Sequence, residues 1–150
     1  MVLRWILAAL HLIALGIGLG AVYARARALR GPLDVSGLRR VFAADAWWGA
    51  AAGLWIVTGL LRAFGGYEKG ADYYLHNHLF LTKMGLLVLI LILESGVMLR
   101  LILWRRAVAR GTLPDTHRAS RYARISMVQA VLVLLMVAAA TGMARGFGAR

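Results

Sequence analysis

The chain has 150 residues, of which 61% are hydrophobic and 16% are charged, and its mean hydropathy is +0.72. Soluble domains are about half apolar, so this composition excludes a soluble globular protein. The net charge is +12, and the absence of cysteine excludes disulfides, thiolate metal sites and cysteine nucleophiles.

Four apolar runs are each long enough to cross a bilayer, which takes about 20 residues. We expect transmembrane helices at residues 5–22, 41–61, 79–104 and 125–143, with boundaries good to a few residues. The first run also has features of a secretory signal peptide, but we expect it to be retained as a helix. Because the connections are short, we predict one all-α integral membrane domain over residues 1–150, folded as an antiparallel four-helix bundle.

Basic residues are concentrated in the first and third connections. The positive-inside rule therefore places these connections in the cytoplasm and both termini outside (N-out/C-out), in a multi-pass protein of the bacterial inner membrane. We expect the arginines to contact anionic lipid headgroups, and we expect no nucleic-acid binding because no folded platform accompanies the charge. The arginines assigned to the two connections are Arg25, Arg27, Arg30, Arg39 and Arg40, and Arg100, Arg105, Arg106, Arg110, Arg118, Arg121 and Arg124.

The second and fourth runs end in similar stretches, "TGLLRAFG" at residues 58–65 and "TGMARGFG" at residues 141–148. Both follow the pattern T-G-x-x-R-x-F-G, and both would lie at the outer ends of their helices. One interpretation is a duplicated helical hairpin. The other is that helix ends at the same interface converge on similar residues. The sequence leaves both interpretations open.

Ionisable residues inside membrane spans are costly and are therefore functional candidates. His11 in the first span and Lys83 in the third lie at similar depth in the outer half and could face one pocket. The spacing also puts His76, Lys83 and Glu94 on one helix face, provided that the third helix extends to His76. Lys83 could instead snorkel outward to the interface.

The inner half of the spans contains three further polar residues, Asp45, Glu94 and Gln129. A carboxylate at this depth must be protonated or paired, and we expect Arg40, Arg100 or Arg124 as its partner. We favour such a structural pairing over a proton path through Glu94, Lys83 and His76.

Over its whole length the sequence resembles a bacterial family of small inner-membrane proteins known only as a domain of unknown function. The resemblance is carried by "AALHLIALGIGLGAVYARARALR", "FAADAWWGAAAGLWIVTGLLRAFGG", "YYLHNHLFLTKM" and the final "ARISMVQA" and "TGMARGFG". It implies a membrane protein and assigns no activity.

Two short stretches also resemble the HemJ-type protoporphyrinogen oxidases and the related copper-resistance D membrane proteins. In the oxidases, an early histidine of helix one precedes a glycine and a proline–arginine pair, and W-x-H-x-K stands near the start of helix three. Here His11 precedes Gly20 and then Arg25, without the proline. Lys83 stands in "LFLTKMGLL", where Leu81 replaces the second histidine. The resemblance implies a haem-b and porphyrin site at His11 and Lys83.

Our leading hypothesis is a small haem-b-binding membrane protein with a redox role, and the sequence does not decide whether it is an enzyme. His11 would be one axial ligand, with His76 or Lys83 opposite, because imidazole suits iron. Arg62 and Arg145 would meet the propionates, and we expect no metal besides the haem iron. The alternatives are a non-catalytic scaffold, either as a homo-oligomer or in a larger membrane complex, and a small proton or ion transporter. The scaffold would use the small-residue runs 50–53 and 138–142 as contact surfaces.

Overall fold

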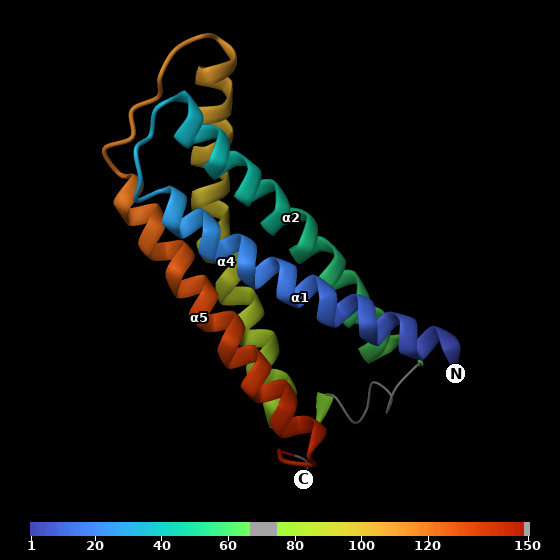
Figure 1. The fold of residues 1–150 in the computed structure, drawn as a ribbon. Helices are drawn as coiled ribbons and strands as arrows, with labels where there is room; N and C mark the ends of the chain where they lie inside the picture. Colours follow the sequence, from blue (N-terminus) through green and yellow to red (C-terminus); the bar gives the residue numbers. More distant parts are fainter. Residues whose placement is uncertain (67–74, 149–150) are drawn as a thin grey trace.

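The structure is a computed structural model that describes residues 1–66 and 75–148. The described residues form four α-helices, and all four are long and apolar enough to cross a membrane. This confirms the predicted all-α membrane bundle. Each helix is longer than the apolar run that predicted it, because the helical backbone continues into the polar ends. The helices are α1 at Val2–Ala28, α2 at Val35–Phe64, α4 at His78–Ala109 and α5 at Ala119–Ala144 (Figure 1).

Local capping signals set the helix ends. The side chain of Asn77 accepts hydrogen bonds from the backbone N–H groups of Leu79 and Phe80, and thereby starts α4. Gly111 and Gly146 follow the last turns of α4 and α5 with φ of +76° and +89°. Both positions need the left-handed conformation that glycine adopts easily, and both belong to Schellman-type helix ends.

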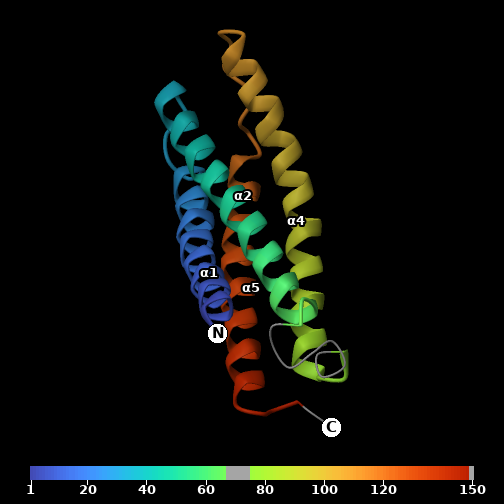
Figure 2. The same ribbon diagram turned by 90° about the vertical axis from the view of Figure 1, so that its right-hand side faces the viewer.

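The helices form two antiparallel hairpins, α1–α2 and α4–α5 (Figure 1). Helix α1 packs closely against α2 and also against α5, whereas α2 and α4 barely touch. We call the end with the α1–α2 and α4–α5 connections the connection end, and the end with both termini the terminal end. The hairpins diverge toward the terminal end, and the last turns of α4 extend beyond the other helices at the connection end (Figure 1, Figure 2).

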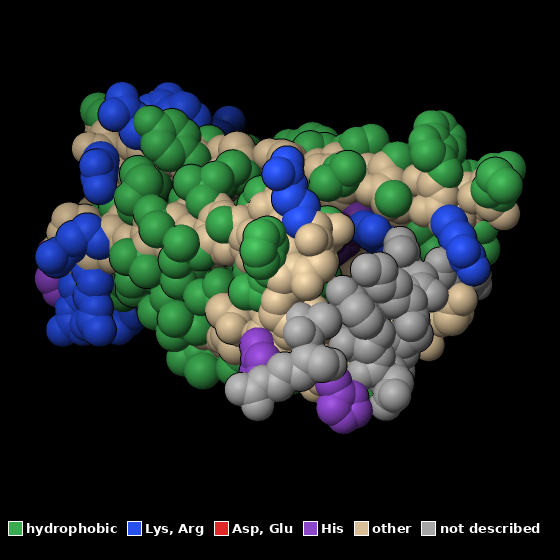
Figure 3. All heavy atoms as spheres, turned by 90° about the horizontal axis from the view of Figure 1, so that it is seen from below, with side chains coloured by type: hydrophobic (Ala, Val, Ile, Leu, Met, Phe, Trp, Pro, Cys, Tyr) green, Lys and Arg blue, Asp and Glu red, His purple; other side chains and the backbone are tan. Residues whose placement is uncertain are grey.

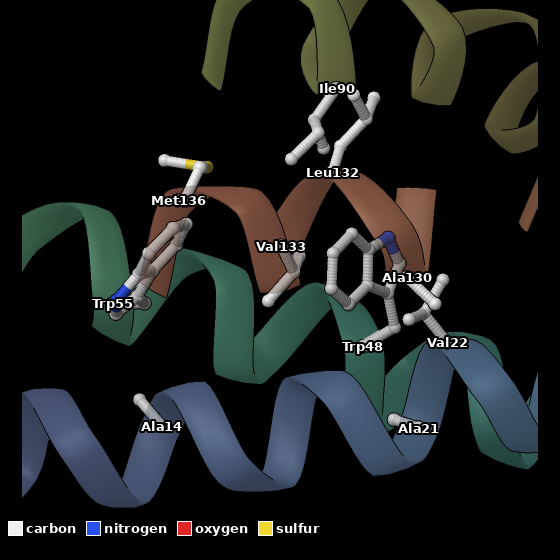
Figure 4. Close-up of a cluster of buried hydrophobic side chains, with 10 residues drawn as sticks. All are labelled: Ala14, Ala21, Val22, Trp48, Trp55, Ile90, Ala130, Leu132, Val133 and Met136. Atoms are coloured by element: carbon white, nitrogen blue, oxygen red, sulfur yellow. The ribbon is translucent and has the colours of Figure 1, made fainter. Parts of the chain in front are cut away.

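The largest buried apolar cluster lies where the hairpins meet and draws residues from all four helices. Trp48 and Trp55 extend from α2 between α1 and α5 (Figure 4). The small residues of α1 allow this approach, since a Cβ added at Gly18 would already lie 3.5 Å from Trp48. Many other large apolar side chains are on the outside of the bundle, where lipid would cover them.

Candidate functional site

His11 is buried on α1, facing α2, and one of its ring nitrogens makes a hydrogen bond to α2. Its Nδ1 lies 3.0 Å from the hydroxyl oxygen of Thr58. Two backbone carbonyl oxygens are within reach of the one proton of that hydroxyl, that of Leu54 at 2.7 Å and that of Trp55 at 3.1 Å. When the hydroxyl donates to either carbonyl, its oxygen accepts from Nδ1–H of His11, and Nε2 then carries the lone pair.

Two neighbours hold the ring of His11 in place. The ring stacks on Trp55, with centroids 5.5 Å apart and planes inclined by 27°. Gly59 provides the space, because a Cβ at this position would lie only 3.1 Å from Cε1 of His11. Thr58 and Gly59 thus have separate roles: the threonine hydrogen-bonds to the ring and the glycine leaves space for it.

His11 and Trp55 line a groove of about 460 Å³ between the two hairpins, in the terminal half of the bundle. We call it the interhairpin groove. All four helices contribute to its mainly apolar lining, and its volume falls within the roughly 300–1,000 Å³ of small-molecule sites. Figure 3 shows basic and histidine side chains inside a recess on this side of the molecule. None of the described residues that line the groove is acidic.

Lys83 reaches the groove from α4, on the opposite hairpin. Its ammonium nitrogen lies 5.9 Å from the centroid of the Trp55 ring, a cation–π arrangement. Of the two orientations that the sequence left open, the structure has the inward one. The described residues include no acid paired with Lys83, and the charge near it is the guanidinium of Arg62, which also lines the groove and repels it.

Two of the predicted haem contacts lie outside the groove. Helix α4 begins at His78 with Asn77 as its cap, so His76 precedes the helix and is exposed. The premise that His76 shares a helix face with Lys83 is therefore wrong. Arg145 is the exposed C-cap residue of α5 and does not line the groove.

A second polar cluster, in the connection half, is centred on Arg25. The sequence assigned this arginine to the first connection, but it lies within α1 and is fully buried. Its guanidinium uses all five N–H donors. Nη1 donates to Asp45 at 2.7 Å, and Nη1 and Nη2 donate to the two carboxylate oxygens of Glu94, both at 2.8 Å. Nη2 also donates to Gln129 at 2.9 Å, and Nε donates to Ser126 at 3.1 Å.

This Arg25 network is closed by its outer members. The amide of Gln129 donates to Glu94 at 2.8 Å, and Arg105 donates to the second oxygen of Asp45 at 2.9 Å. Two arginines thus neutralise two carboxylates, and none of the network residues lines the interhairpin groove. The expected partners of the carboxylates were therefore wrong; these were Arg40, Arg100 and Arg124.

The spacing of α1 contained a signal for Arg25. His11, Gly18 and Arg25 recur every seven residues and are all buried on the same face. The run of arginines after residue 24 resembled a charged connection and concealed this periodicity.

The described residues include no group of three or more histidine, aspartate or glutamate side chains placed to hold a bare metal ion. No curated protein and no solved structure gives a significant match to the chain. Residues 3–148 match the family described as "Predicted membrane protein (DUF2214)", a span that includes all of the polar residues of the groove and of the Arg25 network. The chain therefore belongs to the DUF2214 family of predicted membrane proteins.

Proposed function

We propose that this protein binds haem b in the interhairpin groove, with His11 as an axial ligand through Nε2. The observation that carries the proposal is the 3.0 Å contact between Nδ1 of His11 and the Thr58 hydroxyl, whose own proton has backbone carbonyl acceptors within reach. With Nδ1–H as the donor in this contact, the Nε2 lone pair is left for a ligand. Histidines that bind metals usually donate their other ring N–H in this way, because the donation fixes the tautomer and the ring orientation.

The rest of the groove suits the same group. Its walls are mainly apolar, all four helices form them, and Trp55 offers an aromatic surface beside His11. Lys83 and Arg62 supply positive charge for the propionates. When bound, haem b would supply one-electron redox chemistry. The chain itself would hold the imidazole of His11 in position, exclude water and bind the propionates.

The test is the absorption spectrum of the protein purified in detergent from bacterial cells that make haem. We expect a Soret band from the wild-type protein and its loss in His11→Ala, because the axial nitrogen is removed. Thr58→Val keeps the side-chain volume but removes the hydroxyl, so we expect reduced haem content rather than complete loss.

The matched control is His78→Ala, which removes an exposed histidine from the first turn of α4 and should leave the spectrum unchanged. Circular dichroism on every variant checks that the helices are intact. A colourless wild-type protein, or a Soret band that survives in His11→Ala, would overturn the proposal. The first result would favour a scaffold without a cofactor.

A further inference from the structure

A second cavity lies at the connection end of the bundle, between α4, α5 and the connection that joins them. Its volume is about 220 Å³, and it shares no lining residue with the interhairpin groove. We call it the connection pocket. Two buried rings line it, Trp104 of α4 and Tyr122 of α5, whose centroids lie 6.0 Å apart in an edge-to-face arrangement. Tryptophan and tyrosine gather where the apolar core of a bilayer meets the headgroups, so the pocket lies at the level of that boundary.

The charged groups of the connection pocket are two arginines and one acid. Arg100 comes from α4, Arg118 from the start of α5, and Asp115 from the connection. Nε of Arg118 donates to Nε2 of His117 at 3.0 Å. Because a guanidinium nitrogen can only donate, Nε2 carries a lone pair, and Nδ1–H of the neutral ring donates to Asp115 at 2.6 Å. Two guanidiniums and one carboxylate therefore leave the pocket with one net positive charge.

Both arginines have donors that can bind a ligand. Among the residues that the structure describes, no acceptor pairs with the guanidinium of Arg100, and Arg118 donates only through Nε. The backbone and ring N–H groups of His117 lower the pKa of Asp115, and the charge of Arg100 adds to this effect. Arg100 stands four residues before Trp104, so its side chain extends toward the connection, as snorkelling arginines do.

An exposed apolar stripe on α4 leads to the connection pocket. Its members share one face of the helix and are each more than half exposed; they are Val88, Ile92, Leu99 and Leu103. Leu103 also lines the pocket. A molecule whose acyl chain covers this stripe would therefore bring its headgroup to the two arginines.

We propose that the connection pocket binds the headgroup of one anionic phospholipid, with the phosphodiester between Arg100 and Arg118 and an acyl chain along the α4 stripe. One phosphodiester cancels the net charge of the pocket, whereas a zwitterionic headgroup brings an ammonium that does not. Guanidinium groups bind phosphate through paired, charge-assisted hydrogen bonds. The inference goes beyond the haem proposal and does not depend on it, because the two sites share no residue.

Native mass spectrometry of the full chain, released from nonionic detergent micelles, tests the proposal by counting the lipids on each protein molecule. Phosphatidylglycerol and phosphatidylethanolamine with the same acyl chains are titrated separately, at an ionic strength that screens long-range attraction. We expect the first phosphatidylglycerol to bind about fivefold or more tighter than the first phosphatidylethanolamine. Arg100→Gln and Arg118→Gln should each remove most of this preference.

The same two helices supply matched controls, Arg106→Gln and Arg124→Gln, which each remove one exposed arginine. These arginines stand two residues after Trp104 and Tyr122, about 200° around each helix, and neither lines the pocket. Both controls should keep the preference for phosphatidylglycerol, and circular dichroism checks that all four variants keep their helices.

Three results would overturn the proposal. The first is equal binding of the two lipids by the wild-type protein. The second is an equal loss of preference in all four variants, which would show that the basic surface attracts anionic lipid without a defined site. The third is displacement of phosphatidylglycerol by inorganic phosphate, which has no acyl chain and would then be the better description of the ligand.

Discussion

Arg25 is the residue through which the four helices are joined by polar contacts. Its five N–H groups reach side chains of α2, α4 and α5, and each contact is 3.1 Å or shorter. Because the charges balance and every guanidinium donor is used, the network incurs no penalty for an unpaired buried charge. Removing the guanidinium would leave Glu94 without its cationic partner in the network, whereas Asp45 would keep Arg105.

We therefore expect Arg25→Met to lower the free energy of unfolding by about 3–5 kcal/mol. Arg25→Lys should restore only part of the loss, because an ammonium has fewer donors and lacks the planar fork. Adding Glu94→Gln to Arg25→Met should also recover stability, since it removes the carboxylate that lost its partner. Denaturant titration in micelles measures these differences.

The control is Arg27→Met, which removes an exposed arginine two residues away on the same helix. Its effect should be small. If Arg25→Met and Arg27→Met destabilised the protein equally, the network would not contribute as its geometry implies.

At this scale the sequence predicted which residues matter better than it predicted their partners. His11 and Lys83 were chosen by their depth, and the structure places both in one groove. Depth could not reveal that Asn77 caps α4 and leaves His76 outside the helix. Neither could it reveal that Thr58 bonds to His11, because that contact depends on how α1 and α2 are rotated against each other.

The helix ends, too, could be predicted only in part from hydropathy. Hydropathy marks the part of a helix that lies in lipid, whereas capping residues mark where the helical backbone begins and ends. The predicted spans were therefore short, although Asp34 and Asn77 precede α2 and α4 as recognisable caps. Gly37 strengthens the first of these signals, because a Cβ there would collide with the carbonyl oxygen of Pro32.

The two T-G-x-x-R-x-F-G endings lie at equivalent helix ends but have different roles. In the first, Thr58 bonds to His11, and Gly65 has a φ of −79°. In the second, the exposed Thr141 donates to its own helix, and Gly148 has a φ of +80°. Gly148 also accepts a hydrogen bond from the backbone N–H of His78, which ties the end of the chain to the start of α4. Duplication and convergence both remain compatible with this arrangement.

The cap of α2 should make the stability of the protein depend on pH. The backbone N–H of Gly37 and the hydroxyl of Ser36 donate to Asp34 and lower the pKa of its carboxyl below the ordinary value. A carboxyl whose pKa is lower in the folded state stabilises that state above its unfolded pKa, and this contribution is lost as the pH falls through the folded pKa. We expect the melting temperature of the wild-type protein to exceed that of Asp34→Asn near neutral pH, and the difference to shrink in acid.

Thermal unfolding followed by circular dichroism from about pH 7 to about pH 3 checks this expectation. Asparagine is nearly as good a cap as aspartate, so the substitution removes the titration and largely keeps the helix start. Asp34→Ala removes both the titrating carboxyl and the side-chain cap, and it should lower the melting temperature at every pH. A difference between wild type and Asp34→Asn that stayed constant across the range would contradict the role of the charge.

In the whole molecule, the two polar clusters occupy opposite halves of the bundle. The Arg25 network joins the hairpins in the connection half, where they lie close together. The interhairpin groove lies in the terminal half, where the hairpins diverge. The sequence could predict four antiparallel helices from run length and short connections. It could not predict the divergence, which depends on how closely each pair of helices packs.

Charge is also divided between the two ends, and this determines the expected orientation in the membrane. Exposed arginines are abundant at the connection end, whereas the described residues of the terminal end include two, Arg4 and Arg145, with Arg62 half-buried. Short basic segments stay in the cytoplasm, so the groove should face the outer leaflet. The exposed arginines at the connection end include Arg27, Arg30, Arg39, Arg40, Arg106, Arg110, Arg118, Arg121 and Arg124.

Single cysteines can report this orientation without background, because the sequence contains none. Leu75→Cys introduces a thiol at an exposed position of the terminal end, and Ser120→Cys introduces one at the connection end. In intact bacterial cells a membrane-impermeant maleimide should label Leu75→Cys, and it should label Ser120→Cys only after the inner membrane is broken. The reverse pattern would place His11 and Lys83 in the cytoplasmic leaflet, so that any ligand of the groove would have to enter from that leaflet.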